Sequence, residues 1–306
     1  MKDKITISET DAGNRLDKFL TNSFKEFSRN YLQGAIKNGD VLVNGKKVAP
    51  HYFLKTNDTV TLAVAEQVGP KVNPTKKIKI DVIKETPDYI VLNKPEGLVV
   101  HPAPGVDEPT LVDGLLASFP EIEQVGDDKL RPGIVQRLDR DVSGIMVVAR
   151  NKEMFEHLKK QFKERTVDKE YIGLVQEPIS TPSGVIDFPL ARSKTQRGKM
   201  AARPAGEDGE EAITEYTVEK NFAHESLLKI KIRTGRTHQI RAHLAAFGHP
   251  LIGEKIYKPT KSRITKKIDR LFLHAHTLSF NDLQGKRIAL SSPLPKELTD
   301  YLNSLA

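Results

Sequence analysis

Residues 133–149 read GIVQRLDRDVSGIMVVA, and they place a charged turn between two apolar, strand-like runs. A turn before a buried strand is a position from which side chains project off a rigid sheet edge. Asp139 stands there between Arg137 and Arg140, and nearby cations are expected to keep its carboxylate ionised. Such an anion can act as a nucleophile or a base. For an isolated aspartate, as for Asp141, a structural salt bridge or turn hydrogen bond is the better explanation.

Strand-like runs dominate much of the remaining chain. They are residues 78–83, 89–92, 144–149, 171–175, 227–232 and 287–290. Two helices are interspersed, one starting near Asn151 and the other following Thr237. Because strands and helices do not alternate strictly, we expect an α+β domain with a mixed, mainly antiparallel sheet rather than a doubly wound parallel sheet.

The amino-terminal part of the chain has its own pattern. Apolar residues recur at helical spacing in residues 16–24 and again in residues 31–36, which predicts two short amphipathic helices. Ser28 is placed to cap the start of the second helix, and Gly39 is placed to end it. This small helical pair is followed by strands.

Two strands complete the small unit. Residues 41–43, followed by Asn44-Gly45, predict a strand that enters a tight hairpin turn, and residues 59–64 predict a further strand. A proline-containing, basic and nearly apolar-free stretch then reads as a linker. The expected organisation is a small domain over residues 1–68, a linker over residues 69–79 and a larger domain over residues 80–306.

Composition favours a globular protein with a polyanionic partner. The net charge is +8, with 48 Lys and Arg against 40 Asp and Glu, and such a basic surplus suits a phosphate backbone. The absence of cysteine excludes disulfides, thiolate nucleophiles and cysteine-ligated metals. Residues 1–9 are polar, so we expect no secretory signal, and no run is long enough for a membrane span. We expect a cytoplasmic monomer.

Residues 13–62 resemble an S4 domain, a small RNA-binding module. The matching stretches are GNRLDKFL from residue 13, SRNYLQ from residue 28, IKNGDV from residue 36 and VNG from residue 43. The second helix is expected to bury Tyr31, Leu32 and Ile36. It would present outward the polar side chains Ser28, Arg29, Asn30 and Gln33.

Such outward side chains can contact phosphates and 2′-hydroxyls without reading sequence. Arg15 and Arg29 are therefore candidate RNA-binding residues. Taken alone, Arg15, Arg29 and Lys37 would read as a solvated helix face; the joint match over the whole module favours RNA.

The stretch QRLDRDVSG, residues 136–144, resembles the signature of RluA-type pseudouridine synthases, usually written His-Arg-Leu-Asp-x-x-Thr-Ser-Gly. Three further stretches match the family in order. They are LNKPEGLVVHP from residue 92, KEY from residue 169, and TGRTHQIRAHL from residue 234, which is followed by HPLIG from residue 249. With the S4-like module in front, the resemblance is closest to the subgroup that modifies large-subunit (23S) ribosomal RNA.

The resemblance implies the pseudouridine synthase fold and a defined reaction. The family breaks the bond from ribose C1′ to uracil N1, rotates the base and rejoins it through C5. The oxidation state does not change, so neither a redox cofactor nor a nucleotide is implied. The implied partner is RNA, as free 23S rRNA or in an assembling large subunit.

The resemblance also assigns residue roles. Asp139 is implied as the catalytic aspartate, whether it attacks the sugar, attacks the base or abstracts a sugar proton. Arg241 would pair with Asp139 across the cleft and hold it ionised. Tyr171 would pack on the uracil ring and is a candidate base for the C5 proton. Arg137 would insert into the RNA stack in place of a flipped nucleotide; Arg236 and Lys169 would contact phosphates.

Two positions depart from the family pattern. Gln136 replaces the usual His, and Val142 replaces the usual Thr. Gln can donate and accept hydrogen bonds but cannot carry a charge. If that position only fixes the loop or touches RNA, activity survives; if His transfers a proton, activity falls. Because the family assigns the essential work to the aspartate, we expect an active enzyme.

Two other classes of function compete with this interpretation. A non-catalytic rRNA-binding or ribosome-assembly protein with a decayed site would explain Gln136 and Val142, but it would not explain the joint retention of Asp139, Tyr171 and Arg241. A carboxylate hydrolase needs a second acid at a defined separation, and Asp141 is the one evident partner.

Histidine pairs invite a metal hypothesis. His238 with His243, and His274 with His276, lack the helical spacing and the acidic partner of known metal motifs. We therefore expect structural or RNA-contacting histidines and no metal. The basic run over residues 258–267 reads as a flexible loop that either touches RNA or is simply solvated.

Overall fold

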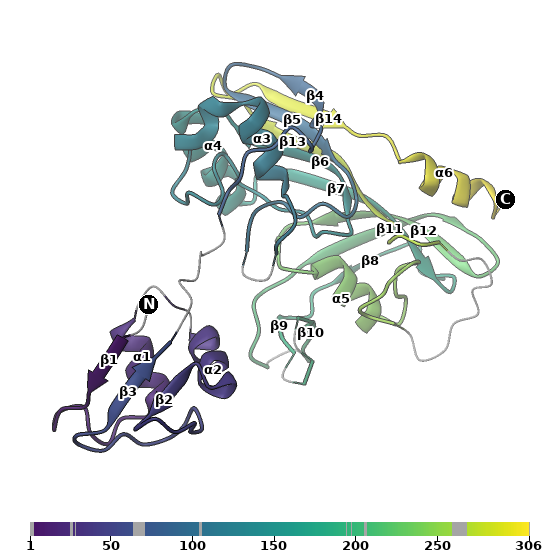
Figure 1. The fold of residues 1–306 in the computed structure, drawn as a ribbon. Coiled ribbons are helices and arrows are strands. Elements are labelled where there is room, and N and C mark those ends of the chain that lie inside the picture. The colour runs from purple at the N-terminus through teal and green to yellow at the C-terminus, as the bar shows by residue number, and fades with distance from the viewer. Residues whose placement is uncertain are drawn as a thin grey trace. The chain divides into compact units, whose positions relative to one another are not determined.

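The computed structural model describes residues 3–24, 27, 29–63, 71–103, 106–193, 195–196, 198–204, 207–258 and 268–305. Ser28 and the side chains of Arg29 and Asn30 lie outside this description, as does most of the basic run 258–267. Contacts between Cα atoms divide the chain into two compact units, Met1–Gly69 and Pro70–Ala306 (Figure 1). No described helix is long and apolar enough to cross a membrane.

The first unit packs two helices on a small antiparallel sheet. Its elements are β1 (Asp3–Thr6), α1 (Leu16–Ser23), α2 (Arg29–Asn38), β2 (Val41–Val43) and β3 (Thr59–Leu62), with strand order β1-β3-β2. Leu16 and Leu20 from α1 and Leu32 and Ile36 from α2 are fully buried, as their helical spacing predicts. Gly39 ends α2 with φ +92°, a conformation that favours glycine.

Strand β1 was not predicted, because its four residues hold a single apolar side chain, Ile5. Pairing with β3 rather than hydrophobicity fixes it at this edge. The predicted Asn44-Gly45 turn is present, with both residues at positive φ and with Val43 and Lys46 exchanging two backbone hydrogen bonds.

The second unit is an α+β domain built on one nine-stranded sheet, with strand order β4-β5-β6-β13-β7-β12-β11-β8 and β14 paired to β13. Its strands and helices follow in chain order. They are β4 (Asp81–Glu85), β5 (Tyr89–Lys94), α3 (Leu111–Ser118), the 3₁₀ helix η1 (Pro120–Gln124), β6 (Ser143–Ala149), α4 (Lys152–Glu164), β7 (Asp168–Gln176), β8 (Ser183–Ile186), β9 (Leu190–Arg192), β10 (Met200–Ala202), β11 (Thr214–Asn221), β12 (Glu225–Ile232), α5 (Gln239–Ala246), β13 (Leu273–Asn281), β14 (Arg287–Ser291) and α6 (Lys296–Asn303).

The sheet is mixed but mainly antiparallel, as the sequence predicted. Among the described strands, β6 and β13 form the parallel pair, through two residue pairs, Ser143 with His274 and Gly144 with Ala275. Every residue of β6 is buried, which explains the continuous apolar run after the charged turn. Gly144 has φ +127°, and a Cβ there would lie 2.2 Å from the carbonyl oxygen of Ala275.

Helix α4 begins where the sequence predicted. Asn151 caps it by accepting a hydrogen bond from the backbone N–H of Met154, and Met154, Phe155 and Leu158 are buried against the sheet. The helix ends at Arg165, whose φ of +60° places a non-glycine residue in the left-handed region.

The predicted strand over residues 78–83 is wrong at its start, because β4 begins at Asp81. Ile78 packs instead on α3 at Gly114, where a Cβ would lie 2.6 Å from the Ile78 side chain. Upstream, the backbone N–H groups of Asn73 and Thr75 donate to Asp113 of α3. The stretch from Asn73 onward, predicted as linker, is therefore attached to α3.

Candidate active site

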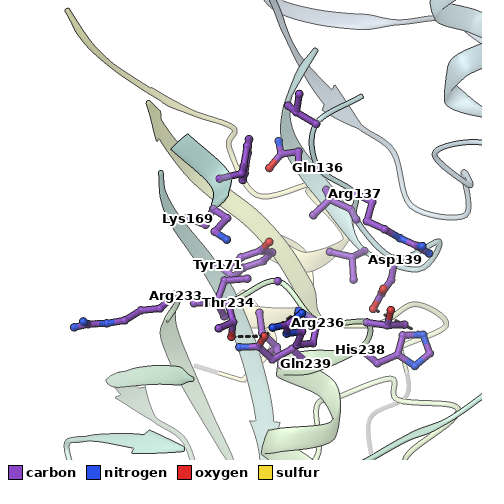
Figure 2. A pocket seen from close by; sticks show the side chains of 18 of the residues that line it. Gln136, Arg137, Asp139, Lys169, Tyr171, Arg233, Thr234, Arg236, His238 and Gln239 are labelled. Atoms are coloured by element: carbon purple, nitrogen blue, oxygen red, sulfur yellow. Dashed lines mark hydrogen bonds and ion pairs between the residues drawn. The ribbon is translucent and has the colours of Figure 1, made fainter. Parts of the chain in front are cut away.

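A cavity of about 560 Å³ opens in the second unit beside the turn that precedes β6. The structure brings into its lining all of the residues predicted for the catalytic domain: Asp139, Tyr171, Arg241, Arg137, Lys169 and Arg236. They come from the turn before β6, from β7, from the loop between β12 and α5, and from α5 itself, which carries Arg241 (Figure 2). Arg15 and Arg29 belong to the first unit.

Asp139 lies in the cavity with its side chain 17% exposed. Its Oδ2 is 3.7 Å from Nη1 of Arg241 and 4.0 Å from Nε2 of His238, and Figure 2 shows the carboxylate directed toward His238. Among the hydrogen bonds of the described residues, none is donated to this carboxylate. Both oxygens therefore remain available to a reacting group, at ion-pair distance from a fixed cation.

The cation beside Asp139 is Arg241, rather than the sequence neighbours that were expected to keep it ionised. Arg140 turns away and pairs with Glu108 at 2.9 Å, while Arg137 is exposed on the cavity lining. A guanidinium 2% exposed beside the carboxylate is a stronger electrostatic partner than an exposed one.

Arg241 is itself held by Glu254, which sequence reasoning missed. The Arg241 Nε and Nη2 atoms donate to the two carboxylate oxygens of Glu254 at 2.8 and 2.7 Å, and both side chains are buried. Burial raises the pKa of Glu254, but the hydrogen bonds and charge of Arg241 outweigh it and hold that pKa below its usual range. Glu254 directly follows the matched stretch at residues 249–253. Its charge is the one sequence feature that could have identified it as a site residue.

The turn that carries Asp139 is braced by Lys94 at the end of β5. The Lys94 ammonium is fully buried and donates to three carbonyl oxygens, of Pro95 at 2.7 Å, Leu98 at 2.9 Å and Arg140 at 3.2 Å. Burial lowers the pKa of Lys94 to about 7. Three carbonyl acceptors together need all three N–H groups, so the charged form fits this site.

Tyr171 projects from β7 into the cavity and is 8% exposed. Burial first, and then the charge of Asp139, raise the pKa of its hydroxyl well above the usual range. Tyr171 is therefore a neutral phenol at physiological pH, with an aromatic face available for packing.

The loop between β12 and α5 is fixed from inside by Gln239. Its side chain accepts from the Thr234 hydroxyl at 2.7 Å and from the Arg236 backbone N–H at 3.1 Å, and it donates to the Ile213 carbonyl. His238, which directly precedes Gln239, lies in the left-handed region with φ +54°. Burial lowers the pKa of His238, which favours a neutral imidazole near Asp139.

The two departures from the family pattern both line the cavity. Val142 is buried, and its backbone N–H closes the turn by donating to the Asp139 carbonyl at 3.1 Å. The Nε2 atom of Gln136 is buried and has no hydrogen-bond partner among the described residues. Gln136 therefore presents an unsatisfied donor next to the turn that carries Asp139.

The predicted RNA contacts at the rim differ in their surroundings. Lys169 is half-buried over the Phe162 ring at 5.8 Å, and burial together with Arg165 lowers its pKa to about 8. Arg236 is exposed and lies 2.6 Å from Glu210. Arg137 is exposed and has no ion-pair partner among the described residues.

In the first unit, Arg15 pairs with Asp17, whose fully buried side chain also accepts from Gln33 at 2.8 Å. Gln33 was expected to face outward, so this expectation is wrong: a buried carboxylate needs donors, and Gln33 supplies one. Arg29 begins α2, with its side chain outside the description.

The histidine pairs have hydrogen-bonding roles. His274 and His276 both contact the Ser292 carbonyl, and His243 is buried between Thr214 and the carbonyl of Phe188. Within the part of the chain that the structure describes, no three His, Cys, Asp or Glu side chains are grouped to hold a metal ion.

Comparison with known proteins matches residues 88–246 to the model of the RNA pseudouridylate synthase family. The chain belongs to this family. Residues 14–60 match the S4 domain model. A relative described as an uncharacterized RNA pseudouridine synthase of Bacillus subtilis is 37% identical over 98% of this chain and 97% of its own length.

Another relative is ribosomal large subunit pseudouridine synthase D of Xanthomonas campestris, 34% identical over 98% of this chain and 91% of its own length. The fold matches human RNA pseudouridylate synthase domain containing 1 with a TM-score of 0.58 and 24% identity, over 76% of this chain and 97% of that one. The chain is thus an RNA pseudouridine synthase, an isomerase, with an S4 domain preceding its catalytic domain.

Proposed function

We propose that this enzyme isomerises uridines of large-subunit ribosomal RNA to pseudouridine, with Asp139 as the catalytic carboxylate. The observation that carries the proposal is the position of Asp139 in the cavity, 3.7 Å from Arg241 and free of hydrogen bonds from described residues. The S4 domain and the named large-subunit relatives support a ribosomal RNA substrate. For such a substrate we propose that the enzyme acts in the cytoplasm and as a monomer.

The reaction requires one glycosidic bond to break and another to form. The bond from C1′ to N1 breaks, the base rotates, a bond from C1′ to C5 forms, and the proton leaves C5 while N1 gains one. Asp139 acts as nucleophile or base in these reaction steps, and both roles need its carboxylate to be ionised. Arg241 keeps that anion in position through its charge, and Glu254 keeps Arg241 in position.

Tyr171 acts by packing on the uracil ring. The raised pKa of its hydroxyl argues against a phenolate that waits to accept the C5 proton. The buried aromatic face next to Asp139 supports the packing role instead.

RNA contacts at the rim hold the target in the cavity. Arg137 is exposed and has no ion-pair partner among the described residues, so it is available to enter the RNA stack once a nucleotide is flipped out. Lys169 and Arg236 line the same cavity and supply phosphate contacts. In the S4 domain, Arg15 and Arg29 contact the RNA backbone.

The test is tritium release from large-subunit rRNA labelled at uracil C5. We expect release by the wild type, no release by Asp139→Asn, and unchanged RNA binding by that variant. The matched control is Asp141→Asn, since Asp141 also lies 3.7 Å from Arg241 but is more exposed. Absence of release by the wild type from any rRNA would favour the alternative, a non-catalytic rRNA-binding or assembly protein.

A further inference from the structure

An acidic pair, Glu210-Glu211, lies against two arginines that line the cavity. Arg236 Nη1 is 2.6 Å from a carboxylate oxygen of Glu210, and Arg236 Nε donates to the Glu211 carbonyl at 3.1 Å. Arg165, at the end of α4, donates to both carboxylate oxygens of Glu211 at 2.6 and 3.2 Å. The two glutamates therefore pair with the guanidinium groups of Arg165 and Arg236 on this side of the cavity.

The backbone beneath these glutamates is anchored. Glu210 exchanges two backbone hydrogen bonds with Leu190, at 2.8 and 2.9 Å. Ala212, which follows the pair, is fully buried with Leu190 and Ala242. Because the backbone is fixed, the glutamate side chains can leave the arginines by rotation alone.

The pairs themselves are exposed to solvent. The Arg165 and Glu211 side chains are 40% and 56% exposed, and those of Arg236 and Glu210 are 38% and 65% exposed. Exposed pairs contribute little to stability, so a competing anion displaces the glutamates at small cost. The Arg165 hydrogen bonds and charge, followed by the charge of Arg236, lower the pKa of Glu211, which stays an anion between the two cations.

A carboxylate held by a guanidinium fork presents the same charge and a similar geometry as a phosphate. We propose that Arg165 and Arg236 form a phosphate-binding pair for the RNA strand beside the target uridine, and that Glu210 and Glu211 occupy this pair in the free enzyme. The inference rests on the proposed function, because the phosphate belongs to the RNA whose uridine enters the cavity.

The arrangement has a consequence for selectivity. An RNA backbone that reaches only Arg165 and Arg236 must first displace two carboxylates, and it gains no contact deeper in the cavity. A strand that also delivers a nucleotide to Asp139 and Tyr171 gains those contacts as well. Displacing the glutamates costs both strands the same free energy, so the deeper contacts alone discriminate between them. RNA that lacks those contacts then binds with an affinity too low to compete with the substrate.

The test measures binding of a short polyuridylate oligonucleotide at fixed salt. We expect Glu210→Gln with Glu211→Gln to bind about fivefold tighter than the wild type, the scale of an exposed ion pair. The control is Glu219→Gln with Asp300→Asn, which adds the same charge at exposed pairs, with Lys229 and Lys296, that do not line the cavity. We expect less than about a twofold change there.

Adding Arg165→Gln to the Glu210 and Glu211 double variant should remove most of the gain. An equal gain in the control variant, no gain in the double variant, or a gain that survives Arg165→Gln would each overturn the proposal. Glu211→Gln alone repeats the test if the double variant is poorly folded. Binding is also measured in the Asp139→Asn background, where it does not depend on catalysis. A wild type that releases no tritium would contradict the proposed function, while the binding results would still test this inference separately.

Discussion

Arg241 donates two hydrogen bonds to Glu254, and the same guanidinium lies 3.7 Å from Asp139. The buried Arg241 guanidinium thus lies between two carboxylates. Glu254 holds it by hydrogen bonds, and Asp139 receives no hydrogen bond from it. Glu254→Gln should reduce the rate of tritium release about tenfold to hundredfold, because Arg241 loses its fixed position. It should also lower the free energy of unfolding by about 3 kcal/mol at neutral pH, since a buried charge loses its partner.

This loss of stability should depend on pH. The pKa of Glu254 is lowered in the folded protein, so its contribution is present above the usual value of about 4.3 and is lost as the pH falls through the folded value. The difference between wild type and Glu254→Gln, measured by urea unfolding, should therefore shrink as the pH falls below about 4.3. Glu225→Gln, a buried acid outside the cavity, is the control. Equal rates for Glu254→Gln and wild type would contradict the positioning role.

Lys169 should make RNA binding depend on pH. Its pKa of about 8 means that the amine carries its charge below pH 8 and loses it above. We expect wild-type affinity for RNA to fall between pH 7 and pH 9, with the salt-dependence slope smaller by about 1 at the higher pH. Lys169→Arg cannot lose its charge and should bind equally at both values. If the affinity of Lys169→Arg declined with pH as that of the wild type does, the pH dependence would come from another group.

Gln136 tests what the family's histidine contributes. General acid–base catalysis accounts for about 10²- to 10⁴-fold in rate, so Gln136→His would raise tritium release strongly if the histidine transferred a proton. We expect a change within about threefold, because Arg241 rather than Gln136 lies beside Asp139. Gln136→Met should leave the free energy of unfolding equal or higher, since it removes a buried donor without a partner.

Gly144→Ala should destabilise the catalytic domain by roughly 3 kcal/mol or more, because the new Cβ meets the Ala275 backbone in a conformation with positive φ. Gly285→Ala is the matched control: it also has positive φ, but nothing lies within 4 Å of the added Cβ, and we expect about 1 kcal/mol. Urea unfolding followed by circular dichroism measures both free energies, because the chain has no tryptophan for fluorescence detection. Equal losses would show that the close approach to Ala275 carries no cost.

Much of the site could be predicted because its residues stand in ordered motifs. Asp139, Tyr171 and Arg241 are far apart in the chain, and resemblance rather than spacing placed them together. Glu254 could not be predicted, since a buried acid that pairs with an arginine looks in sequence like any surface acid. The same holds for Glu211, whose role depends on the tertiary position of Arg165.

The hydrophobic pattern predicted the strands correctly where side-chain packing determines them. It failed to predict strands that are determined by backbone pairing. The apolar runs at β5, β6 and β12 predicted strands correctly. Strand β13 was missed because two histidines interrupt its alternation, and β1 was missed because it holds one apolar residue. In both, backbone pairing with a neighbouring strand compensates for weak local preference.

The two residue pairs between β6 and β13 form the shortest ladder among the described strands of the large sheet. On one side of it lie β4, β5 and β6, within residues 81–149, and on the other lie strands formed by residues 168–291. Asp139 belongs to the first segment, while Tyr171 and Arg241 belong to the second. The candidate site therefore forms only where two consecutive segments of the catalytic domain dock, and activity is expected only once both segments have folded and docked.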